Sequence, residues 1–187
     1  MTRSIYLLLS CLGLVFVGAA CSNTNPNSAS TPADTPAASP TSKRITSEGV
    51  VKVLAQRVEI PVGGSGEATV SITIEKGYHV NANPPTFPYL KATTLELKPA
   101  GGLTVGSIVY PKATDKKFPF AEKPLAVYEG EVEVKALLKA EKTASVGQQS
   151  IPATLRIQAC DDQVCYPPGT LEVAIPVSIY LAVANTK

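Results

Sequence analysis

Two cysteines, Cys160 and Cys165, are the residues of this 187-residue chain that are best placed for redox chemistry. Four residues separate them, and both fall within the run Leu155–Gly169. A thiol pair can form a disulfide when the chain brings the two Cα atoms within about 4.4–6.8 Å. The spacing alone fits both a structural staple and a redox-active pair, so both interpretations stay open at this point.

Metal binding is a weaker interpretation of the same pair. Zinc and iron–sulfur centres take about four ligands, and the chain offers one histidine and four cysteines, of which Cys11 and Cys21 lie near its start. A Cu(I) carrier would need only two thiolates, but no methionine follows Met1 to act as a soft ligand. We therefore expect no metal and no cofactor, and keep the Cu(I) carrier as a minor alternative.

The residues around the pair are more specific than the spacing. Residues 158–168 read QACDDQVCYPP, and the segments GYHVNANPP at 77–85 and YEGEV at 128–132 precede them. Over about residues 47–179 the chain resembles the N-terminal periplasmic domain of the thiol:disulfide interchange protein DsbD. The resemblance implies an immunoglobulin-like fold and a redox-active pair that passes electrons from a membrane partner to oxidised periplasmic proteins.

The resemblance also implies partners. These are thioredoxin-like periplasmic proteins and an integral-membrane thiol transporter of the DsbD or CcdA kind. Full-length DsbD carries a membrane domain and a thioredoxin-like domain, and we find neither pattern in this sequence. We therefore expect a stand-alone lipoprotein whose electrons come from a separate membrane protein.

Further site residues follow from the same resemblance. It makes Cys165 the cysteine that bonds covalently to partners, places an aromatic residue of segment 77–85 near the disulfide, and adds Tyr166 of the Tyr-Pro-Pro motif. Tyr78 or His79 would be that aromatic neighbour. The alternative for His79 is a surface or hydrogen-bonded histidine without a role beside the cysteines.

Between Pro111 and Tyr128 we expect a long stretch without strands. Connections of this length in a compact domain are usually functional or disordered. In the resembled family the matching segment is a cap loop whose aromatic residue covers the disulfide, which points to Phe118 or Phe120. The alternative is that both rings only seal one end of the domain.

Asp161 and Asp162 directly follow Cys160. Carboxylates this close to a sulfur disfavour its ionisation. We expect both thiols of the reduced protein to titrate above the ordinary pKa of about 8.5, unless the fold brings a distant lysine such as Lys116 or Lys117 near.

The start of the chain predicts export. Residues 1–20 combine Arg3 with a short apolar run, which is typical of a signal peptide. Small residues before Cys21 resemble a lipoprotein cleavage site, so we expect acylation of Cys21; ordinary cleavage with a free Cys21 thiol is the alternative. Residues 21–46, rich in Ser, Thr, Pro and Ala, predict a disordered tether. The expected location is the bacterial cell envelope, facing the periplasm, with contact to the membrane through the lipid alone.

Residues 47–187 predict one all-β domain, an antiparallel β-sandwich of seven to nine strands. Hydrophobic residues alternate with polar ones in 68–74 and 132–138, the pattern of half-buried strands. Residues 50–60 indicate one strand. Gly101-Gly102, between two further apolar runs, favours a hairpin.

The last stretch predicts a second hairpin, with the cysteines between runs 154–159 and 173–179. If the alternation of the first run continues, Cys160 faces away from the core. Pro176 in the second run indicates an edge strand or a bulge. The formal charge of +2, with signs interspersed, indicates no nucleic-acid partner. An immunoglobulin-like binding or adaptor lipoprotein with a purely structural disulfide stays open as the alternative function.

Overall fold

The computed structural model describes residues 45–182. This part of the chain is all-β, with twelve strands and one short 3₁₀ turn, η1 (Glu48–Val50). None of its helical segments is long and apolar enough to span a membrane. The strands are β1 (Val51–Ala55), β2 (Val58–Pro61), β3 (Ser65–Ile74), β4 (His79–Asn81), β5 (Thr94–Leu97), β6 (Leu103–Val109), β7 (Thr114–Lys116), β8 (Leu125–Tyr128), β9 (Glu131–Ala140), β10 (Gly147–Ile157), β11 (Ala159–Cys160) and β12 (Gly169–Tyr180).

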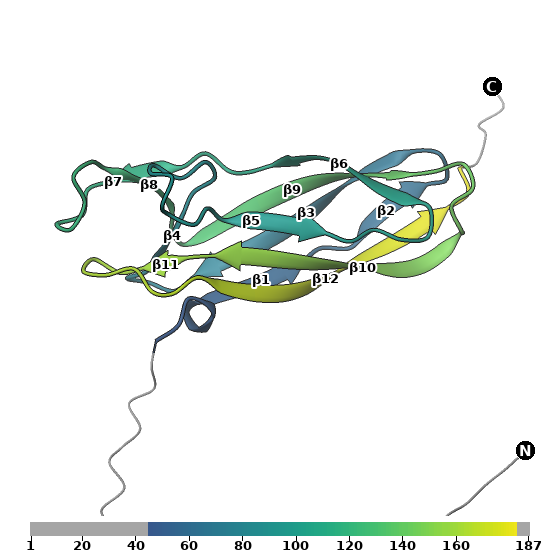
Figure 1. Cartoon of the computed structure of the whole chain (residues 1–187). Helices are drawn as coiled ribbons and strands as arrows, with labels where there is room; N and C mark the ends of the chain where they lie inside the picture. Colours follow the sequence, from purple (N-terminus) through teal and green to yellow (C-terminus); the bar gives the residue numbers. More distant parts are fainter. Residues whose placement is uncertain (1–44, 183–187) are drawn as a thin grey trace, which may run out of the picture. The chain divides into compact units, whose positions relative to one another are not determined.

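Two four-stranded sheets form the sandwich (Figure 1). The first has the order β1-β3-β9-β6 and the second the order β2-β12-β10-β5. The pairings within them are antiparallel except that β2 runs parallel to β12. The predicted all-β immunoglobulin-like sandwich is confirmed, although the strand count exceeds the expected seven to nine because several short strands were not apparent in the sequence.

The core lies between these sheets. The alternating apolar residues of β3 and β9 face those of β10 and β12, and each fully buried Val, Ile or Leu contributes about 1.5–3 kcal/mol relative to an exposed one. The fully buried residues at the centre are Val70, Ile72, Val134, Leu138, Leu155, Ile175 and Val177. The alternation predicted for 68–74 and 132–138 therefore corresponds to real strands with one buried face.

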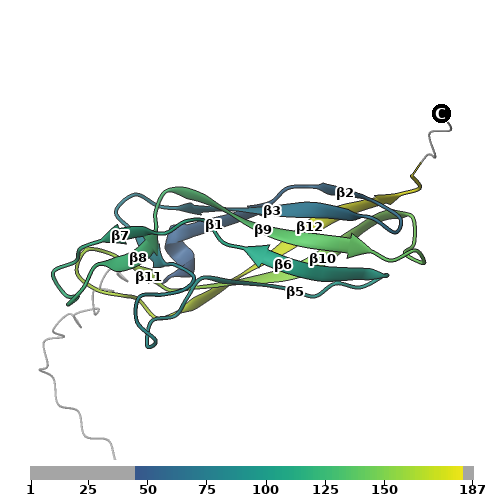
Figure 2. The ribbon, with the colours of Figure 1, turned by 90° about the horizontal axis from the view of Figure 1, so that it is seen from above.

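A third, smaller sheet lies at one end of the sandwich, with the order β11-β4-β8-β7. Figures 1 and 2, which view the domain from two directions at right angles, both place β7, β8 and β11 together at that end. Its strands are two to four residues long. The expected strandless stretch from Pro111 to Tyr128 is wrong in this respect, because β7 and β8 pair within it and leave a loop of residues 117–124.

Two further expectations are wrong because the chain changes sheets. Residues 50–60 form two strands, β1 in the first sheet and β2 in the second. Gly101 and Gly102 do turn the chain, with φ of 66° and 80°, but they connect β5 of the second sheet to β6 of the first and not two paired strands. A pattern of alternating apolar residues shows that one face of a strand is buried. It does not show which sheet the strand belongs to, because both sheets bury a face against the same core.

The last predicted hairpin is present. β10 and β12 pair from Gly147 opposite Ile179 to Ile157 opposite Gly169. Pro176 lies in the part of β12 that pairs with β10 alone, since β2 joins only from Val177 onward. The hairpin leaves residues 158–168 as its connection, and the cysteines lie there.

Candidate functional site

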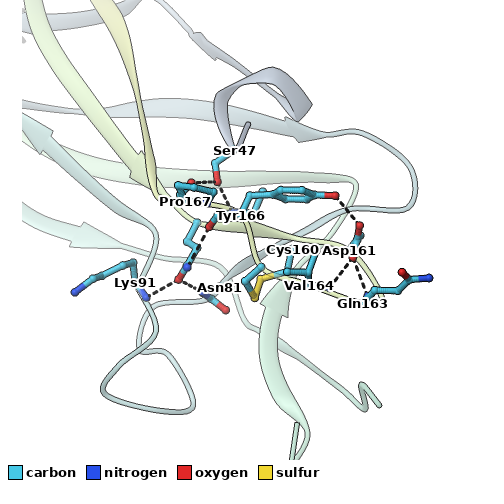
Figure 3. Close-up of a disulfide and its surroundings, with 12 residues drawn as sticks. Ser47, Asn81, Lys91, Cys160, Asp161, Gln163, Val164, Tyr166 and Pro167 are labelled. Atoms are coloured by element: carbon cyan, nitrogen blue, oxygen red, sulfur yellow. Dashed lines mark hydrogen bonds between the residues drawn. A yellow bond between two sulfur atoms is a disulfide. The ribbon is translucent and has the colours of Figure 1, made fainter. Parts of the chain in front are cut away.

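The cysteines form a disulfide inside a small hairpin (Figure 3). Cys160 and Cys165 lie directly opposite one another, with Cα atoms 3.9 Å apart and a bond between their sulfurs. Backbone hydrogen bonds close the hairpin on both sides of the pair: Tyr166 N donates to Ala159 O at 2.8 Å, and Asp161 N donates to Val164 O at 3.0 Å. The connection between β10 and β12 therefore ends in a tight turn closed by the disulfide.

The two cysteines differ in burial. Cys160 is fully buried, whereas Cys165 is half-buried and lines a surface pocket. The expectation that Cys160 faces away from the main core is confirmed, because the alternate residues Leu155, Ile157 and Ala159 belong to that core and Cys160 does not. Its burial was not expected, and it arises because β11 pairs with β4 in the third sheet.

Asp161 shapes the turn. Its Oδ1 accepts hydrogen bonds from the backbone N–H groups of Gln163 at 2.7 Å and Val164 at 2.8 Å, and its Oδ2 accepts one from the hydroxyl of Tyr166 at 2.6 Å (Figure 3). These donors favour the ionised carboxylate and lower the pKa of Asp161. The hydrogen bond between Tyr166 and Asp161 raises the pKa of Tyr166 to about 12.

Two side chains that sequence reasoning missed fix the hairpin to the domain. Ser47, which is fully buried, donates from its hydroxyl to Pro167 O at 2.6 Å and accepts from Ala159 N at 3.0 Å. Gln158 donates to Tyr166 O at 3.2 Å, and its Oε1 accepts from Asn81 Nδ2 at 3.1 Å. The sequence gives no indication of this role for Ser47, because its partner Ala159 lies 112 residues further along the chain.

Gln158 also reaches the loop that follows β4. The backbone N–H of Lys91 donates to the same Oε1 at 3.0 Å (Figure 3). One side chain therefore connects the cysteine hairpin, β4 and the loop of residues 82–93. The sequence motif around the cysteines included this glutamine, but nothing in its spacing indicated which groups it binds.

His79 is the residue of β4 that lies opposite Cys160 in the pairing of β4 with β11. It is fully buried, and neither ring nitrogen has a hydrogen-bond partner among the described residues. Loss of hydration on burial, reinforced by the nearby positive charge of Lys116, lowers the pKa of His79 to about 4. The alternative of a surface or hydrogen-bonded histidine is therefore wrong, and His79 does lie beside a cysteine.

Phe118 covers His79. The two rings stack with centroids 4.2 Å apart, and Phe118 is 5 % exposed. It belongs to a hydrophobic cluster separate from the main core, in which Leu125 and Val127 are buried and Phe87, Leu90 and Ala121 pack against them. Strand alternation puts Val127, His79 and Cys160 on one face of the third sheet, so Phe118 packs over the face that carries Cys160.

Phe120 occupies a different position. It stacks on Phe118 with centroids 5.3 Å apart, but 43 % of it is exposed. It lines, with Cys165, a pocket of about 430 Å³ whose other residues are Tyr89, Leu90, Ala121, Leu125, Gln158, Gln163 and Val164. Sequence reasoning missed Tyr89 and Val164, which are 70 % and 51 % exposed. The half-buried Cys165 thus lies beside an open apolar surface.

Charged groups surround the other side of the site. Lys116 forms ion pairs with Glu129 at 2.6 Å and with Asp162 at 3.8 Å, and its Nζ lies 5.4 Å from the centroid of Phe118. The hydrogen bond with Glu129 raises the pKa of Lys116. The fold does bring one of the two suggested lysines near Asp162, so the negative charge of this aspartate is partly offset.

Tyr78 precedes His79 and contacts the other arm of the hairpin. Its ring lies 6.1 Å from that of Tyr166 between centroids, at an angle of 50°. Both rings are half-buried. The structure therefore brings together the residues singled out from the sequence: the disulfide with Tyr78, His79, Asp161, Asp162, Tyr166 and the two phenylalanines. Cys21 lies outside the described residues.

The fold and the site define an immunoglobulin-like β-sandwich domain with a disulfide in a capped hairpin at one end. Residues 47–176 match the family described as thiol:disulfide interchange protein DsbD, N-terminal. The chain belongs to this family. No curated protein matches it.

Two solved structures are similar. The N-terminal periplasmic domain of ScsB from Proteus mirabilis has a TM-score of 0.50 and 14 % identity, covering 67 % of this chain and 46 % of that chain; this is a likeness of fold. The N-terminal domain of DsbD from Neisseria meningitidis, in its reduced form, has a TM-score of 0.45 and 23 % identity, covering 70 % of this chain and 87 % of that chain.

Proposed function

We propose that this domain carries out thiol–disulfide exchange through the bond between Cys160 and Cys165. The observation that supports the proposal most directly is the difference in burial between the two cysteines. Cys160 is fully buried, whereas Cys165 is half-buried beside an open pocket. Exchange requires one sulfur that a partner thiolate can approach and a second cysteine that leaves or resolves.

The first step is attack on the accessible sulfur. A thiolate of a reduced partner attacks Sγ of Cys165, a bond forms between the two proteins, and the electron pair of the broken disulfide goes to Sγ of Cys160. A second thiol of the partner then displaces Cys165, so that the partner is oxidised and the pair is reduced by two electrons. The reduced pair passes these electrons to the disulfide of an acceptor by the same steps in reverse order.

The partners in this proposal are thioredoxin-like proteins and an integral-membrane thiol transporter of the DsbD or CcdA kind. The pocket beside Cys165 suits a partner whose reactive cysteine sits in an apolar surface, because Tyr89, Phe120 and Val164 expose large apolar groups around it. Exposed apolar side chains gathered at one place are typical of interaction sites. Phe118 acts as the cover that limits access when no partner is docked.

Trapping the mixed disulfide tests the proposal. The Cys160→Ser protein, with Cys165 activated by an aromatic thiol, is mixed with thioredoxin that lacks its resolving cysteine, and release of the aromatic thiol is followed. The Cys165→Ser protein, activated at Cys160, is the matched control. We expect a covalent adduct that forms fast at Cys165 and slowly at Cys160. Equal rates at both cysteines, or no adduct at either, would count against the proposal.

We further propose a layout for the whole chain. Residues 1–20 are a signal peptide, 21–46 an acylated cysteine with a flexible tether, and 47–187 the exchange domain, so the domain is held at the periplasmic face of the membrane by lipid on Cys21. We expect wild-type protein in the membrane fraction and Cys21→Ser protein unprocessed or in the soluble periplasmic fraction. Wild-type protein recovered unacylated would contradict this layout.

A structural disulfide is the second candidate. The hairpin is densely hydrogen-bonded through Asp161, Gln158 and Ser47. This favours the second candidate, because a structural disulfide would serve to keep such a loop rigid. The half-buried Cys165 beside an apolar pocket favours exchange instead. The two candidates differ in the reduction potential of the bond.

A further inference from the structure

His79 presents two hydrogen-bonding atoms that the oxidised protein does not use. It is fully buried, and no described residue bonds to Nδ1 or Nε2. Buried polar atoms without a partner are rare, and each one calls for an explanation. An apolar ring of the same size would stack on Phe118 equally well, so packing alone does not explain a histidine here.

Cys160 is the residue paired with His79. The two residues are directly opposite in the antiparallel pairing of β4 with β11, and such residues place their Cβ atoms about 4.5–5.5 Å apart on the same face. Phe118, stacked at 4.2 Å between centroids, covers one face of the imidazole. The ring therefore lies under this cover and next to the buried Cys160.

The chemistry of Cys160 changes during exchange. In the disulfide, its sulfur carries no hydrogen and is a poor acceptor. When a partner attacks Cys165, the electron pair of the broken bond makes Cys160 a thiolate inside a fully buried site. An anion without a hydrogen-bond donor is strongly disfavoured there, and the carboxylates of Asp161 and Asp162 add to this.

In its neutral form the imidazole of His79 can supply a hydrogen-bond donor to a thiolate at Cys160. The charged groups near it are Lys116 from β7, Glu129 after β8, and Asp161 and Asp162 from the hairpin; burial and Lys116 outweigh the acidic groups and lower the pKa of His79 to about 4. Near pH 7 one ring nitrogen therefore carries hydrogen and the other a lone pair. No group of residues 45–182 fixes the tautomer, so the ring can present N–H to a thiolate or its lone pair to a thiol.

We propose that His79 stabilises the leaving sulfur of the exchange reaction by donating a hydrogen bond from its ring N–H to the thiolate of Cys160. The role rests on the proposed function, since it matters only if the disulfide is broken in turnover. A donor that is in place before charge develops is the arrangement by which enzymes stabilise oxyanions. In the reverse direction the same bond helps Cys160 to ionise when it resolves the mixed disulfide.

The chain allows a test without altering the histidine, because it contains a single one. The protein is labelled with ¹⁵N-histidine, and the ring nitrogen shifts are recorded while the remaining thiol is titrated in Cys165→Ser protein, which keeps Cys160. Cys160→Ser protein, which keeps Cys165, is the matched control. We expect the ring shifts to follow ionisation of Cys160 and not that of Cys165. Ring nitrogen shifts that stay constant while Cys160 ionises would overturn the inference.

Kinetics supply the second test. His79→Phe keeps the aromatic stack and removes both nitrogens, and His79→Gln restores an N–H donor. With reduced thioredoxin we expect the reaction of His79→Phe to slow by at least roughly tenfold, with partial recovery in His79→Gln. The unfolding midpoint of His79→Phe should equal or exceed that of the wild type, because an unpaired buried polar group is removed; a merely structural histidine would give a less stable protein instead.

The failure of this inference can be told apart from failure of the proposed function. If wild-type protein does not react with thioredoxin, exchange itself is wrong. If wild-type and His79→Phe proteins react at the same rate and the ring shifts ignore Cys160, exchange stands and the role of His79 is overturned.

Discussion

At the scale of single residues, the two aspartates after Cys160 have different roles despite their adjacency. Asp161 accepts three hydrogen bonds that hold the turn. The side chain of Asp162 is 73 % exposed, and within the described part of the chain it makes only a long ion pair with Lys116. The sequence predicted one effect for both carboxylates, on the ionisation of the thiols, because spacing cannot distinguish a carboxylate that binds backbone N–H groups from one that faces solvent.

This difference leads to a prediction about stability. Asp161→Ala removes hydrogen bonds to a charged group, and we expect it to lower the free energy of unfolding by about 1–2 kcal/mol. Asp162→Ala, the matched control, should change it by less than about 0.5 kcal/mol, since exposed ion pairs contribute little. Denaturant unfolding of both oxidised variants measures the two values. Equal losses would mean that the hydrogen bonds of Asp161 do not hold the hairpin.

At the scale of elements, the cap is built from two loops. Residues 117–124 supply Phe118 and Phe120, and residues 82–93 supply Phe87, Tyr89 and Leu90. The resemblance pointed to the first loop but not to the second, whose residues carry no pattern that indicates a cover. Their cluster is separate from the main core, so the cap can change without disturbing the sandwich.

The two phenylalanines of the cap predict different effects. Phe118→Ala removes the buried ring over the face that carries Cys160, and we expect reduction of the disulfide by a small thiol to accelerate by roughly tenfold, as if a local opening of about 1.4 kcal/mol were no longer needed. Phe120→Ala should have a smaller effect, because 43 % of this ring is already exposed. Stopped-flow reduction with dithiothreitol compares them. A faster reaction in Phe120→Ala than in Phe118→Ala would show that Phe120, and not Phe118, is the cover.

Sequence patterns were reliable where one periodicity persisted through a whole element. The alternation in β3 and β9 and the final hairpin were predicted for this reason. The third sheet was not, because strands of two to four residues are too short to show a period. The burial of Cys160 within that sheet was missed for the same reason. Contacts between distant segments, such as Ser47 with Ala159, have no signature in a single sequence.

At the scale of the whole molecule, the buried histidine makes stability depend on pH. The pKa of His79 falls from about 6.5 in the unfolded chain to about 4 in the fold, so only the unfolded chain binds the proton between these values. Stability should therefore be full above about pH 6.5 and decline as the pH falls to about 4, by about 3 kcal/mol in all.

Denaturant unfolding of the oxidised protein between pH 7 and 4 measures this decline, and His79→Phe is its control. The variant should lose less stability over the same range. The lowered pKa of Asp161 adds a separate loss below about pH 4, where its carboxylate takes up a proton in the unfolded chain first. Identical pH profiles for wild type and His79→Phe would contradict the pKa assigned to the buried ring.

The central claim is that the bond between Cys160 and Cys165 exchanges with partner thiols. Its most direct test is the reduction potential of the wild-type protein, measured by equilibration with thioredoxin or glutathione buffers and quantified by thiol alkylation. The account predicts a potential above about −300 mV, in the range of labile disulfides. A potential below about −300 mV would identify a structural staple and contradict the proposed exchange.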